Sequence, residues 1–431
     1  MLGYYFSLAW RSLRQNRALT VLMVLTLAVG IGATMTTLTV FKTLSRDPIP
    51  QKSDRLFRVQ LDMYPADVKN SDKEPPYDIS RFDAETLLAQ RHAKAQVVTV
   101  GGSAPLEIDN QTPFSARMRF TSADFFPMFL VPIRYGHGWN ANDDASRARV
   151  AVLSDELNQK IFGGANSVGK TIRIQSTPFT VVGVAGHWRP DPRYYDINTQ
   201  RYGNGEEVYL PFSTSRDLSL GMDGNMDCFK ASNDDNTSLN APCVWLQYWV
   251  ELESPTQAND FRAYLSRYSE QQRAAGRYSR PPNARLRSVT DWLDYRKIVP
   301  SDAHLQLWLA LGFLVVCLVN VVGLLMAKFL RKQGEIGVRR ALGATRRDIF
   351  IQFLMEAGVV GLVGSVGGLL LSLLGLWAVR HQPTDYAEIV HLDPAMLALT
   401  IVLGVIATLL AGLLPAFRAM RIAPAIQLKT Q

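Results

Sequence analysis

Residues 305–327 read LQLWLALGFLVVCLVNVVGLLMA, a run of 23 residues that contains no Asp, Glu, Lys or Arg. At ~1.5 Å of rise per residue, a helix of this length can cross a bilayer core of ~30 Å. Three more uncharged apolar runs, of 22 to 24 residues, lie at 18–41, 357–379 and 396–417. We therefore predict four transmembrane helices. The first two are separated by 263 residues, 42–304, whereas the other connections are short.

The position of the charges predicts how these helices cross the membrane. Residues 42–304 hold 32 Lys+Arg and 32 Asp+Glu, although the whole chain has a net charge of +8. The basic excess lies in 1–17, 328–350 and 418–431, while 380–395 holds one Arg and three acidic residues. By the positive-inside rule, both termini and the loop between the second and third spans are cytoplasmic, and the large domain and the 380–395 turn are external. The basic balance thus indicates topology and gives no reason to expect a nucleic-acid partner.

The N-terminal segment, residues 1–17, is predicted to form an interfacial helix on the cytoplasmic side. Its apolar side chains recur at helical spacing opposite Arg11 and Arg14, and Trp10 suits the headgroup level. The apolar run 18–41 exceeds the length of a signal-peptide core and no small-residue cleavage site precedes Arg46. We expect this first span to remain uncleaved.

The external domain is predicted to consist of two nested parts. A strand–helix–strand order opens the domain and another closes it, with segments at 56–61, 80–90, 96–100, 248–252, 259–268 and 284–289. The two halves suggest one split βαβ layer, built from 42–105 and 247–304, with a β-rich lobe at 106–246 inserted between them. The predicted fold class is an α+β membrane protein with a large α/β external domain.

Residues 164–171, GANSVGKT, match the phosphate-loop pattern G-x-x-x-x-G-K-[ST]. A phosphate loop follows a buried strand and opens a helix, so that backbone N–H groups face the phosphates. Here an amphipathic helix, 154–162, precedes the loop and an alternating strand, 171–175, follows it. The order is inverted and the predicted compartment lacks ATP. We interpret the match as a glycine-rich turn.

The sequence shows no constellation of catalytic residues. The six histidines are scattered, without an H-x-x-x-H or H-E-x-x-H pair for zinc, and there is no G-x-S-x-G motif. We expect a non-catalytic chain with no catalytic, cofactor-binding or metal-binding residue. Cys228 and Cys243 lie in the external domain, where an oxidising compartment allows a disulfide. Closing a loop of about 15 residues would contribute ~3 kcal/mol in the chain-entropy model.

Residues 333–350 read QGEIGVRRALGATRRDIF. This segment resembles the E-I-G-[IV]-R-[KR]-A-[LV]-G-A motif of the MacB/FtsX-like permeases of ABC transporters. The stretches 9–14, 162–184 and 414–425 also resemble that family, so the similarity covers essentially the whole chain. It implies a permease of a type VII ABC transporter in the bacterial inner membrane, with a MacB-like periplasmic core domain at 42–304.

The resemblance implies that the cytoplasmic segment 328–356 contains the coupling helix that docks on an ATPase. The residues that it assigns to coupling are Glu335, Gly337, Arg339, Arg340, Ala341, Gly343, Ala344 and Arg347. Basic side chains here could instead only anchor to anionic headgroups, and both roles are compatible. MacB itself carries a fused ATPase domain, but only about 17 residues precede the first span here. We therefore expect ATP to be bound by a separate ATPase chain.

Small residues on the third span form a face suited to close helix packing: Gly361, Gly364, Ser365 and Gly368. The face could meet another span of the same chain or a second permease copy. Asn320 is the one strongly polar side chain near the middle of the second span, where an interhelical hydrogen bond is expected rather than a substrate contact.

The resemblance also implies partners and leaves the task of the complex open. The partners are an ATPase subunit, a second permease in a homo- or heterodimer and, for an exporter, a periplasmic adaptor with an outer-membrane channel. The implied mechanism is mechanotransmission, in which ATP-driven motion reaches the periplasmic domain and extrudes a substrate across the envelope. An FtsX-like signalling subunit that regulates a cell-wall hydrolase and a lipoprotein-releasing permease are the alternatives. The substrate does not follow from the sequence.

Overall fold

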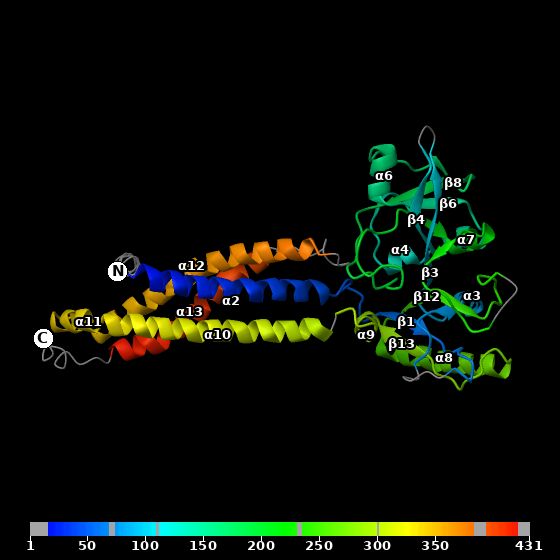
Figure 1. Cartoon of the computed structure of the whole chain (residues 1–431). Helices are drawn as coiled ribbons and strands as arrows, with labels where there is room; N and C mark the ends of the chain where they lie inside the picture. The colour runs from blue at the N-terminus through cyan, green and yellow to red at the C-terminus, as the bar shows by residue number, and fades with distance from the viewer. Residues whose placement is uncertain are drawn as a thin grey trace. The chain divides into compact units, whose positions relative to one another are not determined.

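The computed structural model describes residues 16–68, 74–108, 112–230, 235–299, 301–382 and 394–420 (Figure 1). The interfacial helix predicted for 1–17 falls almost entirely outside these residues, as does the 380–395 turn beyond residue 382. The chain divides into two compact units. One, called the membrane unit here, contains residues 1–45 and 299–431, and the other, called the large domain, contains residues 46–298.

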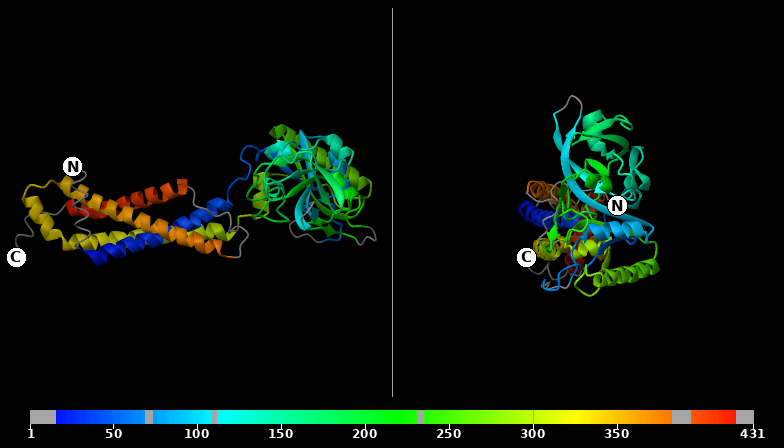
Figure 2. Two further views of the ribbon diagram at one scale, coloured as in Figure 1. Left: turned by 90° about the horizontal axis from the view of Figure 1, so that it is seen from above. Right: turned by 90° about the vertical axis from the view of Figure 1, so that its right-hand side faces the viewer.

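Among its described residues, the membrane unit contains four helices that are long and apolar enough to cross a bilayer, which confirms the four predicted spans. They are α2 (Arg17–Leu44), α10 (Ser301–Arg331), α12 (Arg346–Arg380) and α13 (Pro394–Met420). Figures 1 and 2 show them running side by side. A short helix, α11 (Gln333–Ala341), connects α10 to α12. Each span extends beyond its uncharged run, because charged residues continue the helix at its ends.

The small-residue face of α12 packs against other spans of the same chain. A Cβ atom added at Gly364 would lie 2.9 Å from Leu27 Cβ, and one at Gly368 would lie 2.8 Å from Ile31 Cβ, both on α2. A Cβ atom at Gly361 would collide with Thr408 of α13. The absence of side chains at these positions lets α12 approach both neighbours closely, which is how helices gain packing energy in a bilayer. Within one chain, this face is therefore already occupied.

Asn320 does not make the interhelical hydrogen bond expected of it. Its side chain is exposed on α10, in a shallow groove that α2 also lines through Leu25, Thr26 and Val29. Among the residues that the structure describes, none forms a hydrogen bond with this amide. Within this chain, Asn320 therefore lies on a side of α10 that does not face the other spans, and an interhelical hydrogen bond to a second permease copy stays a prediction.

The large domain is built on one continuous mixed sheet with the strand order β13-β1-β12-β3-β4-β9-β6-β8-β5. Its first four strands are β13 (Arg285–Ser288), β1 (Leu56–Gln60), β12 (Cys243–Glu251) and β3 (Ala95–Glu107), each antiparallel to its neighbour. In chain order this is the 4-1-3-2 arrangement of a split βαβ layer. The helices of its two halves are α3 (Arg81–Gln90), which Ser80 caps through the N–H of Asp83, and α8 (Pro255–Ala274).

The remaining elements lie between β3 and β12 in the chain, apart from the two-residue strand β2 (Ile79–Ser80) and helix α9 (Val289–Tyr295). The helices are α4 (Phe125–Met128), α5 (Ala141–Ala145), α6 (Asp155–Phe162) and α7 (Phe212–Asp217). The strands are β4 (Phe114–Thr121), β5 (Ile133–Gly136), β6 (Val150–Leu153), β7 (Thr171–Ile174), β8 (Thr177–Ala185), β9 (Val208–Pro211), β10 (Met222–Asp223) and β11 (Asp227–Cys228). A large α/β domain with an inserted β-rich lobe is thus confirmed.

The two nested parts are not separated where the sequence suggested. The expected limits at 105/106 and 246/247 fall inside β3 and β12. β3 pairs with β12 over its first residues and with β4 over Thr99–Leu106, so one strand belongs to both parts. The segment predicted at 96–100 is thus part of a longer strand that runs to Glu107. Gly102 leaves room for the ring of Phe120 on β4, with which a side chain there would collide.

Candidate functional site

The candidate site is the connection between α10 and α12, called the connecting hairpin here (residues 328–356; Figure 1). α11 ends at Ala341, and Gly343 adopts φ +104°, a conformation that favours glycine. Thr345 then caps α12: its hydroxyl accepts the N–H of Asp348 at 3.2 Å, and the Asp348 carboxylate accepts the N–H of Thr345 at 2.9 Å. The sequence therefore specifies two helices with a sharp turn between them.

An apolar cluster fixes α11 against the ends of the spans. Phe329 of α10 and Phe353 of α12 meet edge to face with ring centroids 5.8 Å apart. Ile336 of α11 is buried beside them. The cluster also contains Ile349, Ala416 and Ala419, so that it joins α10, α11, α12 and α13. The position of α11 is therefore fixed by close packing against three spans.

Arg339 links α11 to α12 by polar contacts. Its guanidinium forms an ion pair with Glu335 at 2.5 Å, one helical turn earlier, and donates to the side-chain oxygen of Gln352 on α12 at 3.0 Å. Both groups of the ion pair are partly exposed, so the pair itself contributes little stability. Its effect is to hold the Arg339 side chain across the two helices.

An ion pair between Lys328 of α10 and Glu356 of α12 closes the base of the hairpin. The two side chains are 1% and 2% exposed. Sequence reasoning missed this pair because it assigned both residues to a cytoplasmic loop. The available signal was their position: Lys328 directly follows one apolar run, and Glu356 directly precedes the next.

The predicted coupling residues are distributed over both helices and the turn. Arg340, Ala344 and Arg347 do not share one helical face, because α11 ends at Ala341 and α12 begins at Arg346. Ala344 is half-buried against the apolar cluster, so it belongs to the interior of the hairpin. The exposed predicted residues are Glu335, Ala341, Gly343 and Arg347; Gly337 is buried, and Arg339 and Arg340 are intermediate.

Sequence reasoning also missed two exposed apolar side chains on the hairpin. Leu342 in the turn is 83% exposed, and Val338 on α11 is 56% exposed. They stand among basic residues, including Arg346 and Arg347 at the start of α12. Exposed apolar side chains surrounded by polar ones match the general layout of a protein interface, which has an apolar centre and a polar rim.

The phosphate-loop match in the large domain lies between a helix and a strand, as predicted. α6 precedes it and β7 follows it, so no helix begins at the loop. The Lys170 ammonium lies 4.4 Å from the ring centroid of Phe162, and Ser167 donates to the side-chain oxygen of Asn158 at 2.7 Å. These contacts give the loop residues structural roles in a turn.

Two further features bear on the site predictions. A disulfide joins Cys228 and Cys243, with the sulfur atoms 2.00 Å apart. In the part of the chain that the structure describes, no group of three or more His, Cys, Asp or Glu residues could hold a metal ion.

Comparisons with known proteins agree with this architecture. Residues 20–268 match the family model of the MacB-like periplasmic core domain, and residues 308–424 match that of the FtsX-like permease C-terminal. The chain is 25% identical over 430 residues to the macrolide export ATP-binding/permease protein MacB of Pasteurella multocida (strain Pm70), over 99% of this chain and 60% of that protein. It is 23% identical over 427 residues to MacB of Escherichia coli (strain K12), over 97% and 59% of the two chains.

A solved structure is also similar, the periplasmic region of MacB from Actinobacillus actinomycetemcomitans. It matches with a TM-score of 0.38 and 14% identity, over 58% of this chain and 96% of that one. The chain belongs to the MacB/FtsX-like family of ABC transporter permeases, as the two matched models together span most of its length. It spans about three fifths of the length of these curated relatives. Its four spans and periplasmic-type domain fit a protein of the bacterial inner membrane.

Proposed function

We propose that this chain is the permease of a type VII ABC transporter that is driven by a partner ATPase chain docked on the connecting hairpin. The observation that carries the proposal is the exposure of Leu342 and Val338 on a turn and helix that are otherwise fixed by burial. An exposed apolar group on a rigid support loses no conformational freedom when it docks, so it gives affinity at low entropic cost.

Force transmission follows from the contacts that surround α11. Displacement of α11 by the ATPase would act on α10 through Phe329 and on α12 through Arg339 and Ile349. The ion pair of Lys328 with Glu356 would keep the ends of these two spans together, so that both move as one body. We propose that this movement continues along the spans to the periplasmic domain.

The names of its relatives support a proposal for the function of the complex. Two of these are named macrolide export proteins, and on this basis we propose that the complex extrudes a substrate across the cell envelope. Two permease copies or paralogues, two ATPase chains, a periplasmic adaptor and an outer-membrane channel would complete it. In this proposal ATP is bound by the ATPase chain, the N- and C-termini lie in the cytoplasm, and the large domain is periplasmic.

Leu342→Glu tests the docking surface, because it puts a charge at the centre of the apolar contact while changing an exposed side chain. We expect normal membrane insertion but at least tenfold less ABC ATPase recovered with the tagged full-length chain from native membranes, measured by quantitative mass spectrometry. Val168→Glu, at an apolar residue that is 40% exposed in the large domain, is the matched control and should recover the ATPase fully. Equal recovery with both variants would leave the hairpin only a role in headgroup anchoring.

A further inference from the structure

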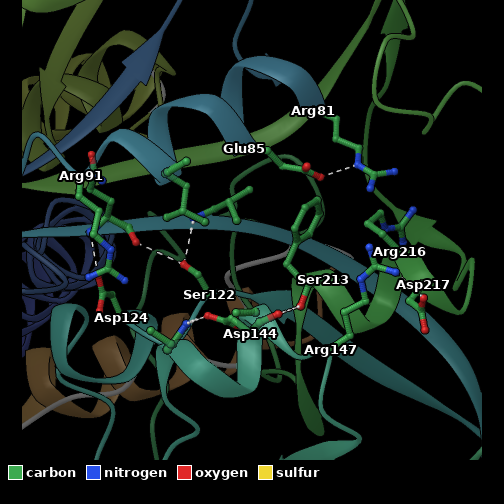
Figure 3. Close-up of a pocket in the computed structure, with 18 residues that line it drawn as sticks. Arg81, Glu85, Arg91, Ser122, Asp124, Asp144, Arg147, Ser213, Arg216 and Asp217 are labelled. Carbon is green, nitrogen blue, oxygen red and sulfur yellow. Dashed lines mark hydrogen bonds and ion pairs between the residues drawn. The ribbon is translucent and has the colours of Figure 1, made fainter.

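The large domain contains a cavity of about 650 Å³ between α3 and the short helices α5 and α7 (Figure 3). Its volume lies in the range of small-molecule sites, ~300–1,000 Å³. Leu88, Val98 and Phe212 give it an apolar wall, and charged side chains stand around that wall. The cavity thus has the size and the mixed lining of a ligand site.

Arg216 lines one end of the cavity without a carboxylate partner. Its guanidinium donates to the carbonyl of Leu220 at 2.6 Å and lies 5.2 Å from the ring centroid of Trp245. Among the described residues, no Asp or Glu forms an ion pair with it. Burial, and secondly the nearby charge of Arg81, lower the pKa of Arg216 to about 10, so the guanidinium still carries its charge at neutral pH.

The acidic residues at this end are already engaged. Glu85 forms an ion pair with Arg81 at 2.6 Å. Asp217 accepts hydrogen bonds from Arg147 at 2.9 Å and from Arg149. Figure 3 places Arg81, Arg147 and Arg216 on the same side of the cavity. Asp235 acts on Arg216 only at longer range, and it accepts hydrogen bonds from the backbone N–H and the hydroxyl of Thr237, both at 2.8 Å. Among the described residues, Arg216 therefore has no carboxylate in direct contact.

The carboxylates farther along the cavity are engaged by other donors. Asp144 accepts the N–H of Ala123 at 2.8 Å and the indole N–H of Trp139 at 2.9 Å. Asp124 accepts the N–H of Gln96 at 3.1 Å. These hydrogen bonds hold both carboxylates in the wall, away from Arg216.

The segment closed by the disulfide borders the arginine end of the cavity. Arg81 donates to the carbonyl of Thr237, which lies between Cys228 and Cys243, at 3.2 Å.

We propose that this cavity binds a small organic anion, with its anionic group on Arg216 beside Arg81 and its aromatic or aliphatic body on the apolar wall. Charge-assisted hydrogen bonds to a guanidinium are stronger than neutral ones, and a partly buried guanidinium without a carboxylate partner has the most to gain from an anion. The proposal is independent of ATPase coupling, because the site lies wholly within the large domain and would serve an exporter or a signalling subunit equally.

Calorimetric titration of the full-length chain in nanodiscs tests the site. The probes are 2-naphthoate and its neutral isostere 2-naphthamide, with empty nanodiscs as the reference. We expect naphthoate to bind at least tenfold more tightly than naphthamide, and Arg216→Gln to abolish that difference. No naphthoate binding, or equal affinity for the two probes in the unaltered chain, would overturn the proposal.

A second variant keeps the test valid if Arg216→Gln does not fold. Ala89→Trp fills the cavity from an exposed position on α3 without changing any charge, and it should weaken naphthoate binding at least tenfold. Arg267→Gln is the charge-matched control, at an exposed arginine of α8 outside the cavity lining, and should bind as the unaltered chain does. Naphthoate affinity that is unchanged by Ala89→Trp would show binding elsewhere and refute the site.

Discussion

Lys328 and Glu356 show how two charges at the ends of apolar runs are accommodated. Each is almost fully buried, and each neutralises the other at the base of the connecting hairpin. A buried pair of this kind need not stabilise the fold more than two apolar residues would. Its contribution is specific, because the pairing selects one register between α10 and α12 and disfavours slipped arrangements that would leave a charge without its partner.

Lys328→Met should destabilise the protein strongly, since it leaves the Glu356 carboxylate buried without its cation. The expected cost is about 3–5 kcal/mol. The double variant Lys328→Met/Glu356→Leu removes both charges and should recover most of the loss. The measurement is the thermal unfolding of the detergent-solubilised full-length chain. If the double variant were as unstable as the single one, the ion pair would not be the reason for the loss.

At the scale of the element, close packing between helices depends on which residues face the neighbouring helix. Gly368 of α12 faces Ile31 of α2, whereas Gly323 near the middle of α10 has no atom within 4 Å of the position that a Cβ would take. Gly368 belongs to the small-residue face predicted from the sequence, and Gly323 does not. The three-dimensional arrangement shows which helix that face contacts.

Gly368→Leu should therefore separate α12 from α2 and lower the Tm of the solubilised chain by several degrees, because overpacking costs roughly 1–3 kcal/mol. Gly323→Leu is the matched control, with the same substitution in another span, and should leave the Tm nearly unchanged. Equal shifts from the two variants would mean that the contact between α12 and α2 does not limit stability.

The elements differ in how well the sequence predicts them, for physical reasons. The spans follow from apolar length alone, because a bilayer imposes that length. The strand–helix–strand halves follow from alternation and from the Ser80 cap. The limits of the lobe did not follow from the sequence, because Gly102 allows a close approach of Phe120 from a neighbouring strand, a contact that is not local in sequence.

The sequence predicted where in the chain the candidate site lies, but only part of its geometry. The motif at 333–350 located the hairpin, but the turn at Gly343 divides the segment that a single helical period would have joined. The exposure of Leu342 and the burial of Ala344 follow from that turn. Tertiary packing, rather than any local pattern, also determines that Lys328 and Glu356 meet.

At the scale of the whole molecule, the two proposed sites lie in different units of the chain. The connecting hairpin lies in the membrane unit and has the contacts needed to receive a force. The large domain has the cavity beside Arg216 and a phosphate-loop match whose residues maintain a turn. These features agree with membership of the MacB/FtsX-like permease family. We propose that ATP is hydrolysed by a partner chain.

ATP hydrolysis by the purified chain and by its complex with the ATPase, both in nanodiscs, tests this central claim most directly. The chain alone should neither bind nor hydrolyse ATP, while the complex should hydrolyse it. Lys170→Ala should leave the rate of the complex unchanged, because Lys170 lies over the ring of Phe162 in a structural turn. Hydrolysis by the chain alone, or loss of activity in a normally folded Lys170→Ala complex, would contradict the account.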